Sequence, residues 1–214
     1  MIDFDIVGET MARAGRNRIY GVVAGVVTNN QDPDGLGRVK VRLPWLSDSD
    51  ETFWARVAAP MAGNGRGLYL LPEVDDEVLV AFEHGSIDRP YILGALWNGQ
   101  DKPPESNSDG KNNQRTLKSR SGHILRLDDT AGSEKIEIVD KTGKNSIVIT
   151  ASDNRITIQA DSDITIQSSN GKLKLAGNGV EITSQSDIKI KASGQGEINA
   201  AGVMTIKGST VNIN

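Results

Sequence analysis

Three short stretches carry residue types that perform chemistry in other proteins. His84, Ser86 and Asp88 are the components of a nucleophilic triad, but all three fall within one loop and no nucleophile elbow surrounds the serine. Gly63-Asn64-Gly65-Arg66-Gly67 has the glycines of a phosphate-binding loop, without its Gly-Lys-Ser/Thr ending or a following helical pattern. Asp75-Asp76-Glu77 offers carboxylates to a metal, but it precedes a strand pattern, where a solvated turn is expected. We therefore predict no catalytic residue, no metal site and no cofactor, and we expect that the protein is not an enzyme.

The composition narrows the class of protein further. The chain has 214 residues, enough for one large or two small domains, and it has no cysteine for disulfides or thiol chemistry. Its net charge is −4 with both signs interspersed, which argues against a specific nucleic-acid partner. The start, Met1-Ile2-Asp3-Phe4-Asp5, does not have the pattern of a secretory signal, and no stretch is long and apolar enough to predict a transmembrane span. We expect assembly in the cytoplasm.

Residue types are distributed unevenly along the chain. All nine aromatic residues lie before residue 98, and all seven prolines lie at or before Pro104. The split falls in residues 99–115, which have the composition of a linker. We predict a globular domain with an aromatic core at 18–98 and a different architecture at 116–214. Residues 1–17 are expected to be either a partly ordered terminus or an arm that docks onto another protein.

The second half of the chain consists of repeats of one short sequence pattern. Its core is a pair of apolar residues with one residue between them, recurring after roughly seven to eleven residues. Such a pair lies on one face of a strand, while the intervening residue, polar nearly every time, faces water. Ser, Asp, Asn and Gly between the pairs predict corners. The pairs are Leu125/Leu127, Ile136/Ile138, Ile147/Ile149, Ile156/Ile158, Ile164/Ile166, Leu173/Leu175, Val180/Ile182, Ile188/Ile190, Met204/Ile206 and Val211/Ile213, with Ile198/Ala200 as the weak member.

Two architectures stack strands as short as these. Two apolar residues per strand are too few to hold a fold, so neighbouring repeats must bury one another. One solution is a single-chain β-solenoid, and the other is an intertwined trimer in which three chains supply the sides of a triangular prism. The array has no aromatic residue to fill a wide coil, whereas a narrow prism suits two aliphatic side chains per strand. We favour the trimeric prism and keep the solenoid as the alternative.

The pattern of the first half predicts strands joined by long loops. Gly37–Leu43 alternates apolar and basic residues, and Glu77–Phe82 and Tyr91–Leu96 have similar strand character. Tyr20–Val27 and Trp54–Ala58 complete a set of five short strands in about 80 residues. Five short strands favour a small closed barrel, for which the OB-fold is the obvious candidate.

Four ordered blocks of this half resemble a known family. They are Gly37–Trp45, Trp54–Ala58, Leu71–Gly85 and Arg89–Gly99. In order and type they resemble the OB-fold segment of the contractile-tail central spike family, which includes the VgrG proteins of type VI secretion and the baseplate assembly protein V of contractile phage tails. The repeat array resembles the trimeric β-helix needle of the same family. The resemblance therefore implies an all-β fold: an OB-fold barrel at 18–98, a linker at 99–115 and an intertwined homotrimeric triple-stranded β-helix at 116–214.

The resemblance also implies partners. Residues 1–17 would contact a hub or baseplate protein, and the large N-terminal hub domains of VgrG have no counterpart here, which favours a separate hub. Some family members end in a pair of histidines that hold iron at the apex. The last residues here, Lys207–Asn214, contain no histidine, so an iron-bearing apex is not expected. A blunt end with open strand edges needs a cover. Val211, Ile213 and Asn214 of three chains would form a platform for a PAAR-type tip protein.

The resulting hypothesis assigns the protein a mechanical function. The protein is expected to be the membrane-piercing central spike of a contractile injection machine (a phage tail, an R-type pyocin or an extracellular injection system), within a virion or virion-like particle. The first alternative is an OB-fold module that binds nucleic acid or glycan on a β-repeat stalk. Against it, Trp45, Trp54 and Trp97 lie in strand or strand-end patterns that fit core positions equally well, and basic residues are not expected to cluster with them. The second is a β-helical polysaccharide-degrading enzyme, which would need paired carboxylates where the repeats carry mainly Thr, Lys and Gln.

Overall fold

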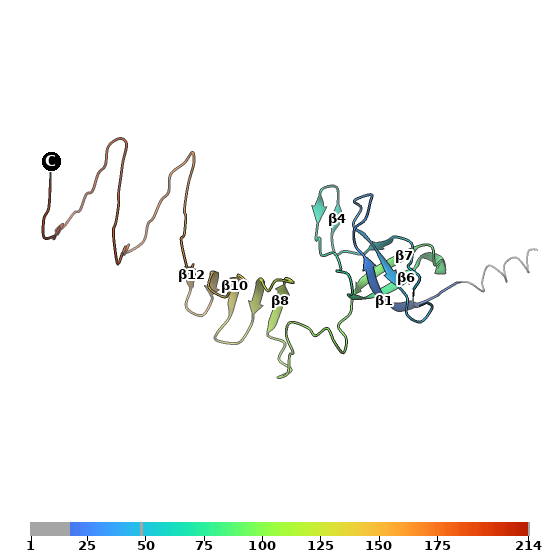
Figure 1. The fold of residues 1–214 in the computed structure, drawn as a ribbon. Coiled ribbons are helices and arrows are strands. Elements are labelled where there is room, and N and C mark those ends of the chain that lie inside the picture. The colour runs from blue at the N-terminus through green and yellow to red at the C-terminus, as the bar shows by residue number, and fades with distance from the viewer. Residues whose placement is uncertain (1–17, 48, 214) are drawn as a thin grey trace, which may run out of the picture. The chain divides into compact units, whose positions relative to one another are not determined.

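The structure separates the chain into two units. The computed structural model describes residues 18–47 and 49–213, and it divides the chain between Asp161 and Ser162 (Figure 1). The regular elements of the described residues are strands, apart from one 3-10 turn, η1 (Glu83–Gly85), so the all-β prediction is confirmed. No helix in the described part is long and apolar enough to cross a membrane. The arm predicted at 1–17 and the tip residue Asn214 lie outside the described residues.

Five strands close into a barrel in the order β1-β2-β3-β7-β6. Neighbouring strands are antiparallel except for β3 and β7, which run parallel. The predicted five-stranded closed barrel is therefore confirmed. Its strands are β1 (Val22–Asn29), β2 (Arg38–Arg42), β3 (Ala55–Val57), β6 (Glu77–Phe82) and β7 (Pro90–Ala95).

Alternation along the barrel strands decides which residues form the core. In β2, Val39 and Val41 are buried while the basic residues between them lie outside, and β6 alternates in the same way. Gly25 of β1 lets the wall close tightly, because a Cβ there would meet the Arg42 carbonyl oxygen and the side chains of Leu43 and Val80 at 3.2 Å. The buried set is Val27, Val39, Val41, Leu43, Ala55, Val78, Val80, Phe82 and Ile92.

The prediction of an aromatic core is wrong. Phe82 is the one aromatic residue of the buried set, whereas Trp45 and Trp97 are 54% and 70% exposed. The barrel is small, so β-branched residues fill its interior without room for an indole ring. The concentration of aromatic residues before residue 98 therefore predicted where the globular domain lies, but not which residues form its core.

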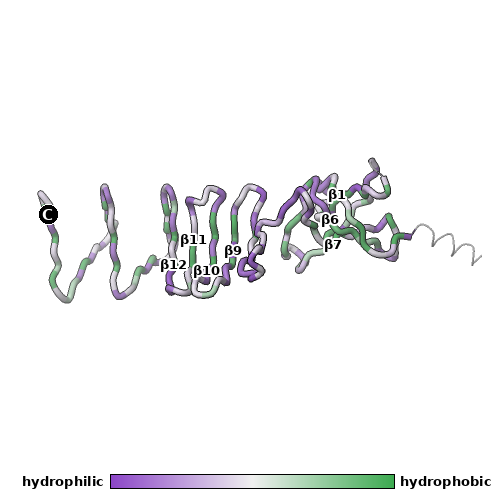
Figure 2. The backbone as a smooth tube through the Cα atoms, turned by 90° about the horizontal axis from the view of Figure 1, so that it is seen from below, coloured by the Kyte–Doolittle hydropathy of each residue, from purple (hydrophilic) through white to green (hydrophobic). Residues whose placement is uncertain are grey.

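A five-stranded antiparallel sheet follows the barrel within the first unit. It is an up-and-down meander in the order β8-β9-β10-β11-β12, and we call it the platform sheet (Figures 1 and 2). Hydrogen-bonded turns join its strands, for example Ser133 N to Thr130 O and Gly143 N to Asp140 O. The strands are β8 (Gln114–Lys118), β9 (Ile124–Asp128), β10 (Lys135–Val139), β11 (Ser146–Thr150) and β12 (Arg155–Gln159).

Residues 162–213 form the second unit, which we call the extended segment. Straight stretches alternate with bends at intervals that match the apolar pairs (Figure 1). Of these described residues, none is assigned to a strand and none makes a backbone–backbone hydrogen bond within the chain. The extended segment therefore has the shape of successive strands without the sheet that would hold them.

Candidate functional site

The stretch around His84 is built as a structural corner. His84 lies in η1 with a positive φ of 50°, its side chain is exposed, and its carbonyl oxygen accepts a hydrogen bond from Arg18 Nη1 at 3.2 Å. The backbone amide of Ser86 donates to Glu83 O at 3.0 Å, and Arg89 N donates to Ser86 O. Gly85 has a φ of 76°, and a Cβ there would meet Arg18 Cβ at 3.0 Å. The corner thus serves to turn the chain from β6 toward β7.

The other two chemical candidates are turns as well. Gly63 and Arg66 pair in a small hairpin of β4 (Ala62–Gly63) and β5 (Arg66–Gly67), which projects from the barrel (Figure 1). Asp75 has a φ of 76°, and Asp76 Oδ2 accepts the Glu73 amide at 2.8 Å, so this turn is fixed directly before β6. Within residues 18–47 and 49–213, no three His, Asp or Glu side chains gather in a way that would hold a metal ion.

Trp54 sits beside basic residues that are distant from it in sequence. The Arg38 guanidinium carbon and Lys40 Nζ lie 5.9 Å and 5.5 Å from its ring centroid. The expectation that tryptophan and basic residues do not cluster is therefore wrong at this position. Both cations are already paired, Arg38 with Asp32 and Asp34 and Lys40 with Glu51, at 2.6–3.1 Å. A stacking surface for nucleic acid needs open rings and unneutralised charge, and this cluster supplies neither.

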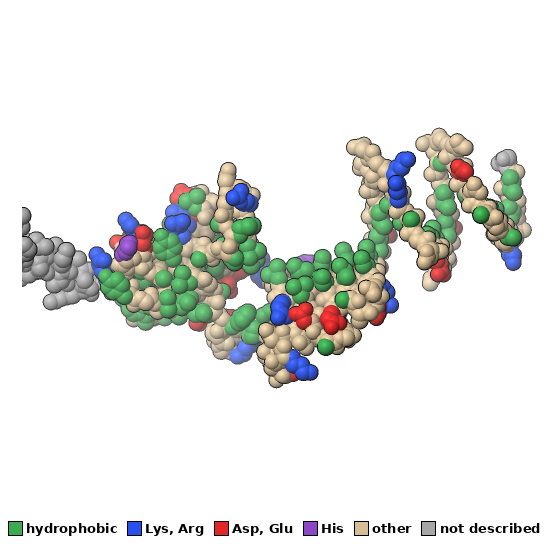
Figure 3. All heavy atoms as spheres, turned by 180° about the vertical axis from the view of Figure 1, so that it is seen from behind, with side chains coloured by type: hydrophobic (Ala, Val, Ile, Leu, Met, Phe, Trp, Pro, Cys, Tyr) green, Lys and Arg blue, Asp and Glu red, His purple; other side chains and the backbone are tan. Residues whose placement is uncertain are grey.

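The platform sheet gathers the apolar pairs of its strands on one face. Its register aligns every apolar pair of β9 to β12, so that two rows of side chains cross the sheet on one face. Figure 3 shows these side chains gathered along one side of the sheet. The nine aliphatic side chains remain between 39% and 66% exposed. One row is Leu117, Leu125, Ile138, Ile147 and Ile158, and the other is Arg115, Leu127, Ile136, Ile149 and Ile156.

Arg115 is the one charged member of these rows, and it stands at the β8 edge. Its Nη1 bonds to Asp129 Oδ2 and to the Asn112 carbonyl oxygen, which ties the guanidinium to the loop beyond β9. The apolar face is therefore unbroken from β9 to β12. An exposed, contiguous aliphatic face of this kind marks an interaction surface.

The opposite face of the platform sheet carries a network of paired charges, with Ile124, Val139 and Val148 among its polar residues. Glu105 of the linker accepts hydrogen bonds from Thr116 Oγ1 at 2.8 Å and from Arg126 Nη2 at 2.9 Å. Arg126 also pairs with Glu137 at 3.3 Å, and Glu137 with Lys135 at 2.9 Å. The Thr116 hydrogen bond, followed by Arg126, holds the pKa of Glu105 below its ordinary value. Burial disfavours the charge of Arg126, but Glu105 and Glu137 outweigh it and raise its pKa. The charges of this face are therefore paired within the chain.

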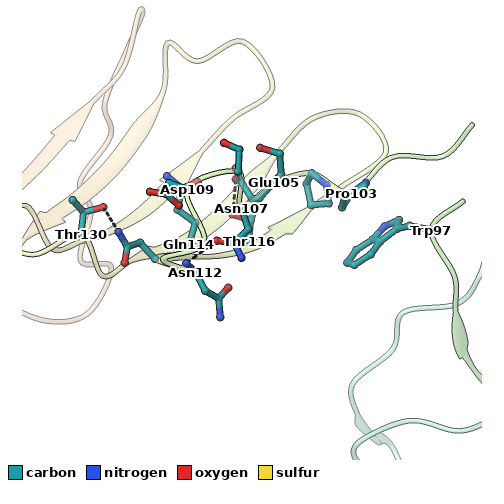
Figure 4. Close-up of a pocket in the computed structure, with 13 residues that line it drawn as sticks. Trp97, Pro103, Glu105, Asn107, Asp109, Asn112, Gln114, Thr116 and Thr130 are labelled. Atoms are coloured by element: carbon teal, nitrogen blue, oxygen red, sulfur yellow. Dashed lines mark hydrogen bonds between the residues drawn. The ribbon is translucent and has the colours of Figure 1, made fainter. Parts of the chain in front are cut away.

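A cavity of about 490 Å³ lies where the linker crosses this polar side. Trp97, Pro103 and polar side chains of residues 105–116 line it, and Asn113 Nδ2 bonds to Thr130 Oγ1 at 3.4 Å (Figure 4). Thr116 and Glu105 face each other across the lining through the bond described above. The polar lining groups mainly bond to one another, so the cavity reflects the linker's path and gives no indication of a ligand.

The extended segment exposes its apolar pairs even more fully. Ile190 is 82% exposed and Ile198 is 78% exposed. The predicted tip residues Val211 and Ile213 are 47% and 87% exposed, and their role stays a prediction. Corners in this unit are open bends, in contrast to the hydrogen-bonded turns of the platform sheet. One signal for this difference was present in the sequence: the spacing between pairs is eleven residues from Ile136 to Ile147 and eight from Ile156 to Ile164.

Comparison with known proteins identifies the barrel. Residues 23–97 match the family model described as the type VI secretion system/phage-baseplate injector OB domain. The chain is 36% identical over 111 residues to the type VI secretion system spike protein VgrG3 of Vibrio cholerae, covering 48% of this chain and 11% of that protein. It is 28% identical over 157 residues to the spike protein VgrG1a of Pseudomonas aeruginosa, covering 68% of this chain and 24% of that protein. The chain thus spans at most about a quarter of the length of these two relatives.

Proposed function

Through its OB barrel this chain belongs to the VgrG and phage baseplate V-like spike family, and we propose that it is the central spike of a contractile injection machine. The observation that carries the proposal is the apolar face of the platform sheet together with the extended segment. Neither is complete in one chain, and both are of the kind that a homotrimer would bury. Spike proteins of this family are structural components of baseplates, which agrees with a role that needs no catalytic site.

The proposed mechanism is transmission of force. The barrel would attach the spike to the baseplate hub, and sheath contraction would drive the repeat array through the target cell envelope. Three chains bonded along their length resist bending, because each strand is held by neighbours on both edges. The residues between the apolar pairs are polar or charged at nearly every repeat, so they remain hydrated and do not adhere to lipid. The machine would be a phage tail, an R-type pyocin or an extracellular injection system.

Two further partners belong to the proposal. Residues 1–17 would dock onto the hub, and Val211, Ile213 and Asn214 of three chains would seat a PAAR-type tip protein. Removing residues 211–214 is expected to abolish tip binding while leaving the native mass unchanged. Unchanged binding of a purified tip protein to the shortened chain would refute the tip assignment alone.

Particles from the encoding organism test the function itself. Quantitative mass spectrometry of purified contractile particles is expected to find three copies of the chain per baseplate. Deleting its gene should abolish assembled baseplates or leave particles that contract without penetrating a target envelope. Particles that assemble and penetrate normally without the chain would contradict the proposal. Retention of the chain on immobilised single-stranded nucleic acid or glycan would instead favour the binding-module alternative.

A further inference from the structure

The two parts of the repeat array differ in how many of their backbone groups form hydrogen bonds within the chain. Each inner strand of the platform sheet, β9 to β11, pairs along both edges with strands of the same chain. In the described residues of the extended segment, no backbone group pairs with another. Strands without a sheet have no independent stability in water. The platform sheet lacks only a cover for its apolar side chains, whereas the extended segment lacks its hydrogen-bonding partners as well.

From this contrast we propose that the trimer is held in two different ways, and that the platform sheet forms and associates first. This inference rests on the proposed spike function and deepens it by naming the interface that starts assembly. Three preformed platform sheets pack their apolar faces together through side chains alone. The extended segments then pair with one another strand by strand, between chains.

The occupant of the apolar face is the same face of another copy. The face is two aliphatic rows wide, and from β9 to β12 no charge interrupts it, so three identical faces can close on one another. The charged face behind it already has its partners in Glu105, Arg126 and Glu137. The rival occupant is the chain's own extended segment folded back, which is the single-chain solenoid. The described bends of this segment lack the backbone–backbone hydrogen bonds of hairpin turns, which argues against that reversal.

The order of assembly follows from locality and register. Contacts of the platform sheet join strands that are adjacent in sequence, so they form quickly and need no second chain. Pairing between extended segments is intermolecular, and because their repeats are alike a slip by one repeat buries nearly the same residues. The Arg115–Asp129 pair marks one end of the platform rows and gives them a unique alignment. Association of the platform sheets would therefore set the register of everything that follows.

Neighbouring residues on opposite faces give matched variants in the full-length chain. Ile158→Asp places a charge in the apolar face of β12, and Thr157→Asp places the same charge on the opposite face of that strand. Ile190→Asp and Lys189→Asp form the equivalent pair in the extended segment. In an isolated chain all four positions are exposed, so a monomeric fold would tolerate all four substitutions equally. Intrinsic fluorescence verifies folding of the barrel, since all three tryptophans lie in that half of the chain.

The readouts are native mass by light scattering and segment-resolved hydrogen–deuterium exchange. We expect the wild-type chain, Thr157→Asp and Lys189→Asp to have three times 22.9 kDa, with residues 162–213 protected. Ile158→Asp is expected to fall to 22.9 kDa and to lose protection throughout 162–213. Ile190→Asp is expected to remain trimeric and to lose protection only around residues 188–198.

Three results would overturn the inference. A trimeric Ile158→Asp would show that the apolar face is not the interface. Dissociation of Ile190→Asp as complete as that of Ile158→Asp would show that the platform sheet does not lead assembly. A monomeric Ile158→Asp with 162–213 still protected would mean that the segment folds onto its own chain. A wild-type mass of 22.9 kDa would instead contradict the homotrimer of the proposed function.

Discussion

Asp32 organises the loop between β1 and β2. Its carboxylate is 3% exposed and accepts hydrogen bonds from the amides of Asp34, Leu36 and Arg38 at 3.0–3.2 Å. Arg38 adds Nε and Nη2 bonds at 2.9 Å and 2.7 Å. The Arg38 bond, helped by the amides, holds the pKa of Asp32 far below its ordinary value. Because the same arginine covers Trp54, this carboxylate couples the loop to the outer wall of the barrel.

We predict that Asp32→Asn lowers the thermal midpoint of barrel unfolding and makes it less dependent on acid. A carboxylate with a depressed folded pKa stabilises the fold above its unfolded pKa, and the contribution is lost as pH falls through the folded value. In the wild-type barrel that loss should begin below about pH 4. Fluorescence melts at pH 7 and pH 3 should therefore differ less for the variant than for the wild type. Equal pH dependence in both proteins would contradict the role given to Asp32.

Residues in turns could be predicted from the sequence, whereas the partners of charged residues could not. The glycine- and aspartate-rich stretches were predicted as turns, and Asp75, Gly85 and the β4–β5 hairpin confirm it. The Arg38–Trp54 contact joins β2 to the residue directly before β3, sixteen positions away, so it depends on strand register that composition alone does not specify. The same limit hid Glu105, a linker residue whose partners Thr116 and Arg126 lie on two later strands.

At the scale of elements, β7 shows how alternation separates core from surface. Ile92 is fully buried and Leu93, its neighbour, is 48% exposed. We predict that Ile92→Ala lowers the free energy of unfolding by about 2–5 kcal/mol, because it leaves a cavity among tightly packed valines. The matched substitution Leu93→Ala should change it by no more than about 0.5 kcal/mol. Denaturant titrations followed by tryptophan fluorescence measure both, and similar losses in the two variants would disprove the assignment of Ile92 to the core.

The linker is anchored to the platform sheet through Glu105. We predict that Glu105→Gln makes residues 101–110 about threefold to tenfold more susceptible to limited proteolysis, since a partly exposed charge-assisted hydrogen bond contributes on the order of 1 kcal/mol. Glu181→Gln, an exposed glutamate of the extended segment, is the control and should leave the cleavage rate unchanged. Identical cleavage of the linker in the wild type and the Glu105 variant would show that this carboxylate does not hold the linker.

The apolar pairs predicted strands and faces correctly for β9 to β12, but not how strands pair along the whole array. Each pair of β9 to β12 falls on one face, as the spacing of two residues requires. What the pattern did not reveal is that pairing within one chain ends at β12, although identical pairs continue to Ile213. Strand pairing depends on turn geometry and on partners outside the chain, neither of which an apolar spacing encodes.

At the scale of the whole molecule, the chain combines a barrel that buries its own core with a repeat array that lacks partners within one chain. The barrel has a closed sheet and a buried core, and its family is that of injector OB domains. The array leaves apolar rows and strand backbones without partners in one chain. Three interlocked chains would satisfy both, and unfolding one would require unwinding the others, which slows dissociation.

The native mass of the full chain tests this account most directly. Light scattering in buffer and in mild denaturant is expected to give three times 22.9 kDa in both, persisting under conditions that dissociate ordinary oligomers. A mass of 22.9 kDa in buffer would contradict the homotrimeric spike and leave a single-chain solenoid as the architecture of the array.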